Sequence, residues 1–445
     1  MADKKICIIG CGITGLSTGA VFARLGHRVR LVETDESRLS AVIEGEAAAQ
    51  EPDLPSLLSR GMRTRKLSLG DDVGEGVDSS DYIFISPRTP AARSGTPNLA
   101  HMKEASKLVG ACSLNGRVVV IRKTAWPGAI EEILAPIIEK ASGLKAGREF
   151  GLAANPAFFS RGAAIEGCLR PSRIIVGATN RRTASDVMGL YGGIDSPKLL
   201  TDIRTAEMVK LASNCFLATK ISYTNEIANL CERLGVDAME VMKGVCLDPE
   251  VGGAFMKPGL GFGGDRLPRD LAAMISAAES ADMKPDVLRA VQKVNDRQPL
   301  RAITILQEEL GDLRGKRIAI LGLAYKAGVG EADGSRAFSI AIELMARGAR
   351  VVGYDPLAKS SFIGMLPEMS YASSAQEALL DADACVIQTD EREFSGLNKR
   401  DFELMRKKIV VDGRRVTSPT KLRKYGVTLR GIGLGGESRR RAVRR

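Results

Sequence analysis

The chain has 445 residues, of which 26% are charged and 44% are hydrophobic, and its formal net charge is +11 at pH 7. This length is too great for a single hydrophobic core and predicts two or three domains, while the composition is that of an ordinary globular protein. The absence of any run of about 18 apolar residues excludes a transmembrane helix, so a membrane is not an expected partner. The sequence begins without a recognisable signal peptide, and we therefore expect a cytoplasmic location.

The cysteines and the basic residues limit the kinds of site to be expected. The eight cysteines are scattered without a CxxC pair and there are only two histidines, so no metal site is expected and the thiols fit a reduced core. Residues 437–445 hold five arginines and one glutamate, a local charge of +4. Because no basic patch with interleaved aromatic residues accompanies them, we expect a disordered solvated tail and no nucleic-acid partner.

The N-terminal residues follow the order strand, glycine-rich turn, helix, strand, acid. An apolar strand at 5–9 leads into Gly-Cys-Gly-Ile-Thr-Gly at 10–15, and a helix of small residues continues to about residue 25. The next strand, 28–32, ends at Glu33. This order predicts a Rossmann-like domain that binds a dinucleotide.

Each residue type in this turn suits a dinucleotide. Gly10 permits a tight turn, Gly12 lets the backbone approach a pyrophosphate, and Gly15 lets the helix pack closely on the strand. Glu33 stands where an acid binds the ribose, and its charge repels a 2′-phosphate, which favours NAD over NADP. Taken alone, Glu33 also fits a solvated strand end.

The middle of the chain carries one long helical pattern. Residues 205–234 contain neither glycine nor proline and show helical periodicity. Lys210 and Asn214 lie four residues apart there and therefore project from one face of the helix. A lysine can stabilise an oxyanion and an asparagine can donate a hydrogen bond, although by themselves the two residues also fit an exposed polar pair.

A second series of alternating strands and helices follows. Strand-like runs occur at 316–321, 349–354, 383–388 and 409–411. The predicted fold class is thus α/β, with two Rossmann-like doubly wound parallel-sheet domains joined by a central helical domain that contains one long helix. We place an NAD-binding domain at 1–195, a central helical domain of the dimerisation type at 196–298, a second Rossmann-like domain at 299–436 and the basic tail at 437–445.

Several motifs resemble those of the UDP-glucose/GDP-mannose 6-dehydrogenase family. Residues 259–270 read Gly-Leu-Gly-Phe-Gly-Gly-Asp-Arg-Leu-Pro-Arg-Asp, which is similar to the family's GFGGxCxPKD signature. Residues 206–214 resemble AELxKxxxN, residues 155–162 resemble NPEFLxEG, and the loops at 87–90 and 123–127 resemble VPTP and KSTVP. The resemblance implies NAD as cofactor, a nucleotide sugar bound by the C-terminal domain, a role in polysaccharide biosynthesis, and a homodimer.

The resemblance also implies the site residues. The implied cofactor-binding residues are Gly10, Gly12, Ile13, Thr14, Gly15, Glu33, Thr89 and Thr124. The implied substrate-binding residues are Phe158, Phe159, Arg161, Lys210, Asn214, Phe262, Gly263, Lys326 and Arg414. The implied catalytic positions are Lys210, Asn214, Asp270 and Arg266, the last of which stands where the family has its nucleophilic cysteine.

The departures from the family concentrate at positions that face substrate. The family's hydrolytic glutamate falls on Ala157, a second glutamate falls on Arg161, and an arginine falls on Glu250. Covalent catalysis at a carbonyl carbon needs a nucleophile such as a thiolate, and the protonated guanidinium of Arg266 is not one. The sequence therefore predicts an altered substrate or a single two-electron oxidation, and the two introduced arginines favour an anionic substrate group.

Three hypotheses about function remain open from the sequence. The first is an NAD-dependent oxidoreductase that acts on a CH–OH group of a nucleotide sugar with this curtailed or redirected chemistry. The second is an ordinary 6-dehydrogenase that recruits another thiol, such as Cys215 or Cys246. The third is a non-catalytic or regulatory relative that binds NAD or a nucleotide sugar, and the intact glycine-rich turn favours the first two over it.

Overall fold

A computed structural model describes residues 3–48, 51–90, 92, 95–123 and 125–435, without the side chain of Ala47. Thr124 and the basic tail at 437–445 lie outside the described residues. The chain divides into two compact units. Unit 1 comprises Met1–Ser213 with Ala272–Ala281, and unit 2 comprises Asn214–Leu271 with Asp282–Arg445. The domain boundaries expected at residues 195, 298 and 436 stay a prediction.

Unit 1 is built on an eight-stranded sheet with the order β3-β2-β1-β4-β5-β6-β7-β8. Its strands are β1 (Lys5–Ile9), β2 (Arg28–Val32), β3 (Leu67–Gly70), β4 (Tyr82–Ile85), β5 (Val118–Ile121), β6 (Gly151–Ala154), β7 (Ile174–Ala178) and β8 (Lys198–Thr201). Neighbouring strands are parallel except β6 and β7, which pair antiparallel, so the last two strands run against the other six. The sheet is thus mixed at this edge rather than wholly parallel.

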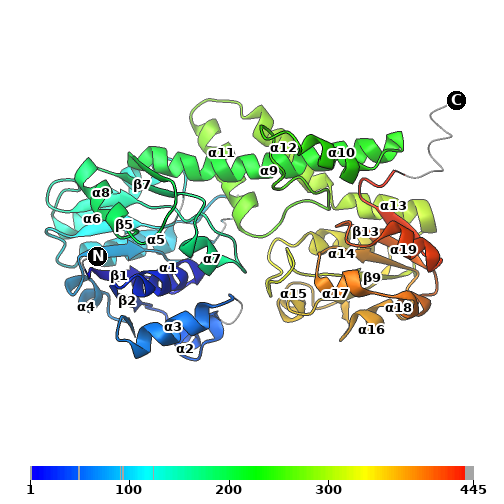
Figure 1. Cartoon of the computed structure of the whole chain (residues 1–445), viewed down its shortest axis with the longest axis horizontal. Coiled ribbons are helices and arrows are strands. Elements are labelled where there is room, and N and C mark those ends of the chain that lie inside the picture. The colour runs from blue at the N-terminus through cyan, green and yellow to red at the C-terminus, as the bar shows by residue number, and fades with distance from the viewer. Residues whose placement is uncertain (1–2, 49–50, 91, 93–94, 124, 436–445) are drawn as a thin grey trace. The chain divides into compact units, whose positions relative to one another are not determined.

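Helices cover both faces of this sheet (Figure 1). Because successive side chains of a strand point to opposite faces, Ile6 and Ile8 of β1 lie in one core, and Cys7 and Ile9 lie in the other. The helices are α1 (Ile13–Arg24), α2 (Glu36–Ile43), η1 (Glu46–Ala48), α3 (Leu54–Arg63), α4 (Val73–Asp78), α5 (Ala100–Gly110), η2 (Ile130–Leu134), α6 (Ala135–Ser142), α7 (Ala164–Leu169) and α8 (Arg181–Gly189).

Unit 2 contains a six-stranded parallel sheet with the order β11-β10-β9-β12-β13-β14. Its strands are β9 (Arg317–Leu321), β10 (Arg350–Tyr354), β11 (Ser370–Tyr371), β12 (Ala384–Ile387), β13 (Ile409–Asp412) and β14 (Thr428–Gly431). Its helices include α10 (Ala238–Val245), α12 (Asp286–Arg297), α13 (Leu300–Leu310), α14 (Arg336–Ala346), α15 (Lys359–Met365), α16 (Ala375–Leu379), α17 (Arg392–Gly396), α18 (Lys399–Glu403) and α19 (Pro419–Lys424). Both sheets reverse their strand order beside the first strand, which confirms two doubly wound domains.

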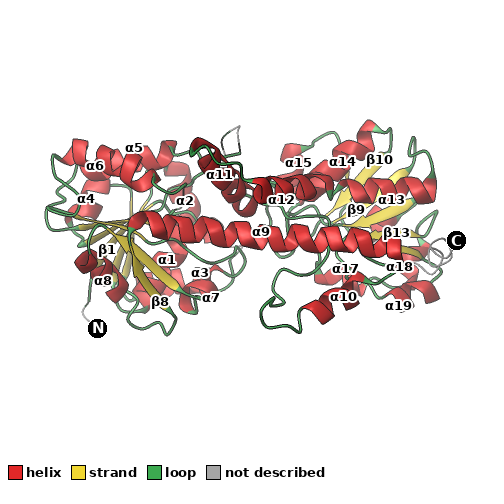
Figure 2. Cartoon of the chain, turned by 90° about the horizontal axis from the view of Figure 1, so that it is seen from above, coloured by secondary structure: helices red, strands yellow, loops and turns green. Residues whose placement is uncertain are grey.

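The predicted long helix is α9, which runs without interruption over Ile203–Leu234 (Figure 2). Asp202 begins it by accepting hydrogen bonds from the backbone N–H and the hydroxyl of Thr205, each over 2.7 Å. Gly235, with φ +71°, follows its last residue, as is typical of a helix end. A second helix, α11 (Arg266–Ser280), begins at the end of the glycine-rich segment. No described helix is long and apolar enough to cross a membrane.

Candidate active site

The glycine-rich turn after β1 has the conformation that the sequence predicts. Gly10 has φ +99°, and a Cβ there would lie 2.7 Å from the Cα of Pro87. A Cβ on Gly15 would lie 2.0 Å from the carbonyl oxygen of Gly10, so only glycine lets α1 pack this closely on the turn. At Gly12 the nearest atom to a built Cβ is the Cγ of Arg88 at 4.0 Å, which leaves open space above this residue.

These residues fit a bound NAD. Gly12 is the N-cap of α1 and no side chain of the described residues caps this helix end, so its first backbone N–H groups remain open to an anion. Glu33 is 7% exposed and accepts the backbone N–H of Cys11 over 2.8 Å through Oε2. The same side chain thus ties the end of β2 to the turn. Glu33 is therefore a buried, hydrogen-bonded residue and not the solvated strand end that was its alternative.

The other predicted cofactor residues lie near the same turn or outside the described chain. Thr14 is half-buried in the first turn of α1, and its hydroxyl is 3.1 Å from the Nζ of Lys123 in the loop after β5. Ile13 is half-buried, and Thr89, in the loop after β4, is 5% exposed. Their roles toward NAD stay predictions.

The loop between β6 and α7 carries the predicted substrate residues of unit 1. Its first residue, Asn155, is fixed by the hydroxyl of Tyr191 and by the guanidinium of Arg122, which both donate to its Oδ1, while its Nδ2 donates to the carbonyl oxygen of Ile175 over 2.8 Å. Burial raises the pKa of Tyr191 to about 12, so this phenol stays a neutral donor. The loop therefore leaves the sheet from a rigid point.

Two cations lie against the ring of Phe158 in this loop. The guanidinium carbon of Arg173 is 4.1 Å from the ring centroid and the Nζ of Lys210 is 4.9 Å from it. Lys210 is 6% exposed and donates a hydrogen bond to the carbonyl oxygen of Ala157 over 2.7 Å. Arg173, which the sequence interpretation did not single out, also donates to the hydroxyl of Ser213 over 2.8 Å.

The neighbouring predicted residues follow in the same loop. Phe159 is half-buried, and a Cβ on Gly167 of α7 would lie 2.5 Å from its Cβ, so this ring packs close against α7. Arg161 is half-buried two residues further on. Unit 1 thus brings Phe158 and Lys210 together and places Phe159 and Arg161 in the same loop.

Two buried glutamates, also missed from the sequence, hold loops of unit 1. Glu207 lies one turn before Lys210 in α9, and its carboxylate accepts the backbone N–H groups of Gly128 and Ile130 over 2.7 and 3.2 Å. Burial raises the pKa of Glu207 to about 8, against the opposing effect of these two donors. Glu51 similarly holds the end of the loop that carries Phe158.

The predicted residues of unit 2 form a second group, whereas Lys210 belongs to unit 1. The Nδ2 of Asn214 donates to the Oδ2 of Asp270 over 2.5 Å, and the guanidinium of Arg269 donates to Oδ1 over 3.2 Å from two nitrogens. Asp270 is fully buried. Both of its oxygens are therefore engaged by hydrogen-bond donors.

Three side-chain amides hold the glycine-rich segment 259–264. Asn295 accepts the backbone N–H of Phe262 over 2.7 Å and donates to its carbonyl oxygen over 3.2 Å. Asn225 accepts the N–H of Gly259 over 2.8 Å, and Gln298 donates to the carbonyl oxygen of Gly259 over 2.8 Å. The segment is consequently fixed at two points by residues of α9, α12 and the turn after α12.

The same segment makes close backbone contacts that require glycine. A Cβ on Gly263 would lie 2.2 Å from the carbonyl oxygen of Gly334, and one on Gly264 would lie 2.6 Å from the ring of Tyr325. A Cβ on Gly259 would lie 3.0 Å from an Nη atom of Arg414. The glycines thus bring Gly259 beside Arg414, and Gly263 and Gly264 beside the loop after β9, in which Lys326 is half-buried.

Arg266 is the first residue of α11 and lies one turn before Asp270. Burial lowers the pKa of its guanidinium, while the nearby Asp270 and Tyr325 act in the opposite direction. The thiol of Cys215 lies 3.8 Å from the carbonyl oxygen of Asp270, and burial raises the pKa of this thiol to about 12. Cys246 is half-buried at the end of α10.

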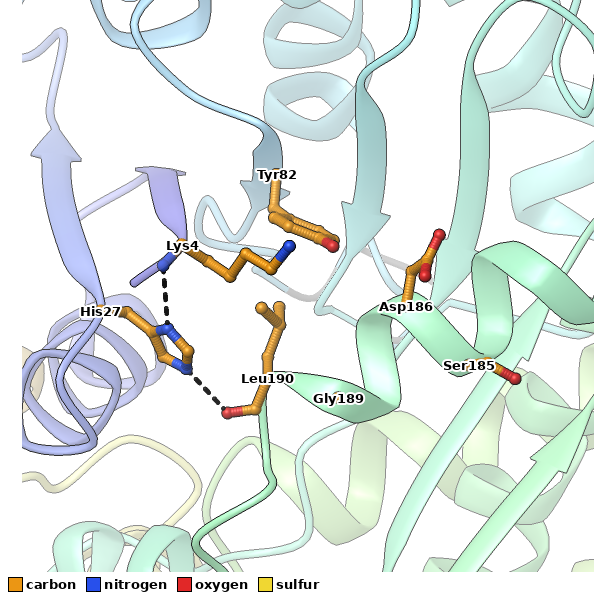
Figure 3. A pocket seen from close by; sticks show the side chains of 7 residues that line it. All are labelled: Lys4, His27, Tyr82, Ser185, Asp186, Gly189 and Leu190. Carbon is orange, nitrogen blue, oxygen red and sulfur yellow. Dashed lines mark hydrogen bonds between the residues drawn. The ribbon is translucent and has the colours of Figure 1, made fainter. Parts of the chain in front are cut away.

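One surface pocket lies at the amino ends of the strands of unit 1, whereas the glycine-rich turn lies at the carboxyl end of β1 (Figure 3). Lys4 and Tyr82 line it at the amino ends of β1 and β4, with Asp186 and Leu190 from α8 and its end. Within it, a ring nitrogen of His27 lies 3.0 Å from the carbonyl oxygen of Leu190. Because dinucleotides bind beyond the carboxyl ends of such strands, this pocket is not the predicted cofactor site.

Comparisons with known proteins agree with this arrangement over most of the chain. Residues 4–195 match the NAD binding domain of the UDP-glucose/GDP-mannose dehydrogenase family, residues 204–297 match its central domain, and residues 319–419 match its UDP binding domain.

Individual relatives are similar over nearly their full length. The UDP-glucose 6-dehydrogenase AglM of Haloferax volcanii is 38% identical over 422 residues, which cover 93% of this chain and 97% of that protein. The UDP-glucose 6-dehydrogenase TuaD of Bacillus subtilis is 33% identical over 432 residues, covering 97% of this chain and 93% of that protein. The solved structure of a UDP-glucose dehydrogenase from the archaeon Pyrobaculum islandicum has a TM-score of 0.88 at 34% identity, with 98% of both chains covered.

Proposed function

The chain belongs to the UDP-glucose/GDP-mannose dehydrogenase family. On that premise we propose that it oxidises, by two electrons, one CH–OH group of a nucleotide sugar whose sugar already bears a carboxylate or similar anionic group. Membership of this family gives NAD as the cofactor and a nucleotide sugar as the ligand. NAD, when bound, accepts a hydride from the carbon that bears the hydroxyl group. The extent of oxidation and the anionic character of the substrate rest on residues of this chain.

Restriction to a single oxidation follows from the side chains at two positions. Arg266 stands at the family's cysteine position and Ala157 at its hydrolytic glutamate position. Without a nucleophilic thiol no thioester can form, and without the glutamate carboxylate there is no general base to activate the water that would hydrolyse it. Cys215 is a poor replacement because a thiol with a pKa of about 12 is almost wholly protonated at neutral pH.

The proposal that the substrate carries an anionic group on its sugar rests on the two cations that lie against the ring of Phe158. Arg173 and Lys210 both lie within 5 Å of the ring centroid, and Arg161 follows in the same loop. The terminal nitrogens of Arg173 donate to the hydroxyls of Ser172 and Ser213, and the planar set of five N–H donors of a guanidinium suits a carboxylate. Ala157 leaves this loop without the negative charge of a glutamate at that position.

The proposed reaction needs few groups. As the alcohol becomes a carbonyl, its carbon loses a hydride to NAD and its oxygen loses a proton to solvent water. The Lys210 ammonium stabilises the negative charge that develops on this oxygen. Asn214, which Asp270 holds within unit 2, stays a predicted hydrogen-bonding residue of the reaction.

A homodimer built on α9 is part of this proposal. Phe216, Tyr223 and Leu230 are spaced by seven residues, so they share one face of the helix, and they are 63%, 51% and 50% exposed. An exposed apolar stripe of this kind fits a second copy of the chain. Sedimentation should give twice the monomer mass for the wild type and the monomer mass for Tyr223→Glu. A monomeric wild type would contradict the dimer.

The test of the substrate is a comparison of two nucleotide sugars that differ by a carboxylate. In titration calorimetry with NADH in place of NAD, so that no oxidation occurs, UDP-glucuronate should bind about tenfold more tightly than UDP-glucose, and Arg173→Gln should remove this preference. Arg170→Gln is the matched control, because Arg170 is exposed and pairs with Glu166. Equal affinities, or a preference for UDP-glucose, would contradict the anionic substrate.

Two other functions have distinct outcomes when NADH formation is measured. The similarity to UDP-glucose 6-dehydrogenases favours an ordinary member of that class, which would form two NADH from each UDP-glucose. A non-catalytic relative would bind NAD or a nucleotide sugar and form no NADH with any nucleotide sugar.

A further inference from the structure

The loop between β6 and α7 has no regular secondary structure, yet both of its ends are fixed. Asn155 holds the beginning through Arg122 and Tyr191, as described above. Between its ends the loop presents Phe158 and Arg161. Irregular backbone of this kind keeps one conformation only where side chains or other backbone groups satisfy its hydrogen bonds.

The end of the loop is held by Glu51, which lies just before α3. Its Oε1 accepts the backbone N–H of Gly162 over 2.7 Å and its Oε2 accepts the N–H of Ala164 over 3.1 Å. Glu51 is 3% exposed, so water does not compete for these bonds. Gly162 has φ +76°, a conformation that glycine adopts readily and that the two bonds help to fix.

We propose that Glu51 is a positioning residue that keeps the 157–162 loop in its substrate-binding shape. Glu51 acts through the backbone of Gly162 and Ala164 and is not a catalytic residue. The proposal rests on the proposed function, in which Phe158 and Arg161 lie at the substrate. Loss of the carboxylate would leave two N–H groups without their acceptor and release the carboxyl-terminal end of the loop.

The loop itself can be tested in the ligand-free protein by amide hydrogen exchange. In Glu51→Ala, the amides of residues 158–164 should exchange at least about tenfold faster than in the wild type, because two charge-assisted bonds are lost. Glu51→Asp, which keeps the charge, should restore part of the protection. Glu46→Gln is the matched control, since Glu46 is an exposed glutamate in η1 of the same connection.

Two exchange results would overturn the proposal. Unchanged exchange at 158–164 in Glu51→Ala would mean that the carboxylate does not hold the loop. Faster exchange throughout unit 1 would make Glu51 a support of the whole fold rather than of this loop.

A binding measurement connects the loop to its role. In Glu51→Ala the dissociation constant of NAD should stay within about twofold of the wild type, while that of UDP-glucuronate should rise about tenfold. Parallel loss of both ligands, or retention of both, would overturn the positioning role. A wild-type protein that binds no nucleotide sugar would instead defeat the proposed function, and the exchange experiment would still decide whether Glu51 holds the loop.

Discussion

The ammonium nitrogen of Lys210 donates a hydrogen bond to the carbonyl oxygen of Ala157 over 2.7 Å, so α9 and the loop after β6 are joined at the residue that we place at the reacting alcohol. Lys210→Ala should lower kcat/KM by about 100-fold or more, because one preorganised donor to the developing oxyanion is lost. The dissociation constant of NAD should hardly change. These values can be measured by initial rates and by calorimetry.

Lys220→Ala is the matched control for that variant. Lys220 also lies on α9 and donates to backbone carbonyl oxygens, those of Val251 and Gly252 over 3.1 and 2.8 Å. Its removal should leave kcat/KM within a few-fold of the wild type. Equal losses in both variants would assign the effect of Lys210 to helix packing and contradict its role at the oxyanion.

The glycine-rich turn allows fold and cofactor binding to be separated. Gly12→Ala should leave the melting temperature unchanged, since the new Cβ meets nothing closer than 4.0 Å and φ is −70°, yet it should weaken NAD binding because the open space over the turn is filled. Gly15→Ala should lower stability and NAD binding together, since its Cβ would lie 2.0 Å from a carbonyl oxygen.

Gly244→Ala serves as the control for the two turn variants. Nothing lies within 4 Å of a Cβ there, and alanine favours the α10 helix, so stability should stay equal or rise. Unchanged NAD affinity in Gly12→Ala would place the pyrophosphate elsewhere.

Glu207 gives the stability of the protein a defined pH dependence. Its pKa of about 8 exceeds its ordinary value of 4.5, so the folded chain binds this proton more tightly than the unfolded chain does. The contribution to stability is therefore full below about pH 4.5 and is lost as the pH rises through about 8. Denaturant unfolding measures the expected effect. As the pH rises across this interval, the free energy of unfolding of the wild type should fall relative to that of Glu207→Gln, whose side chain does not titrate. A constant difference between the two proteins would contradict the raised pKa.

The local patterns of the sequence were enough to predict the two doubly wound sheets, the turn at Gly10 and the uninterrupted α9. These features depend on short-range periodicity and on glycine at close approaches. The reversal of β7 and β8 was not predicted, because strand direction depends on the tertiary path of the chain rather than on the strand's own residues.

The contacts of Glu51 and Arg173 could not be predicted for a related reason. Glu51 bonds to residues 111 and 113 positions away, and Arg173 bonds to Ser213 40 positions away, so no local spacing marks them. In each case an ordinary charged residue gains its role only through folding. Most of the predicted substrate residues lie in the two loops that these buried polar contacts and the Asn295 amide support.

The two substituted positions can be reversed together. With UDP-glucose, which offers a primary alcohol, the double variant Arg266→Cys with Ala157→Glu should form some carboxylate product and raise the NADH formed per sugar above one, because it restores a nucleophile and a base. Arg266→Ala with Ala157→Glu is the control that lacks the thiol and should form none. Carboxylate production by this control would show that the thiol is dispensable. Failure of the cysteine variant, with NAD and sugar binding intact, would contradict the assigned positions.

The central claim, a single two-electron oxidation, is tested most directly by the stoichiometry of the wild-type reaction. NADH formed and nucleotide sugar consumed would be measured together to completion, by absorbance and by chromatography, with product identification by mass spectrometry. We expect one NADH for each nucleotide sugar and a product that has lost two hydrogen atoms. Two NADH for each nucleotide sugar, with a newly formed carboxylate, would contradict the claim.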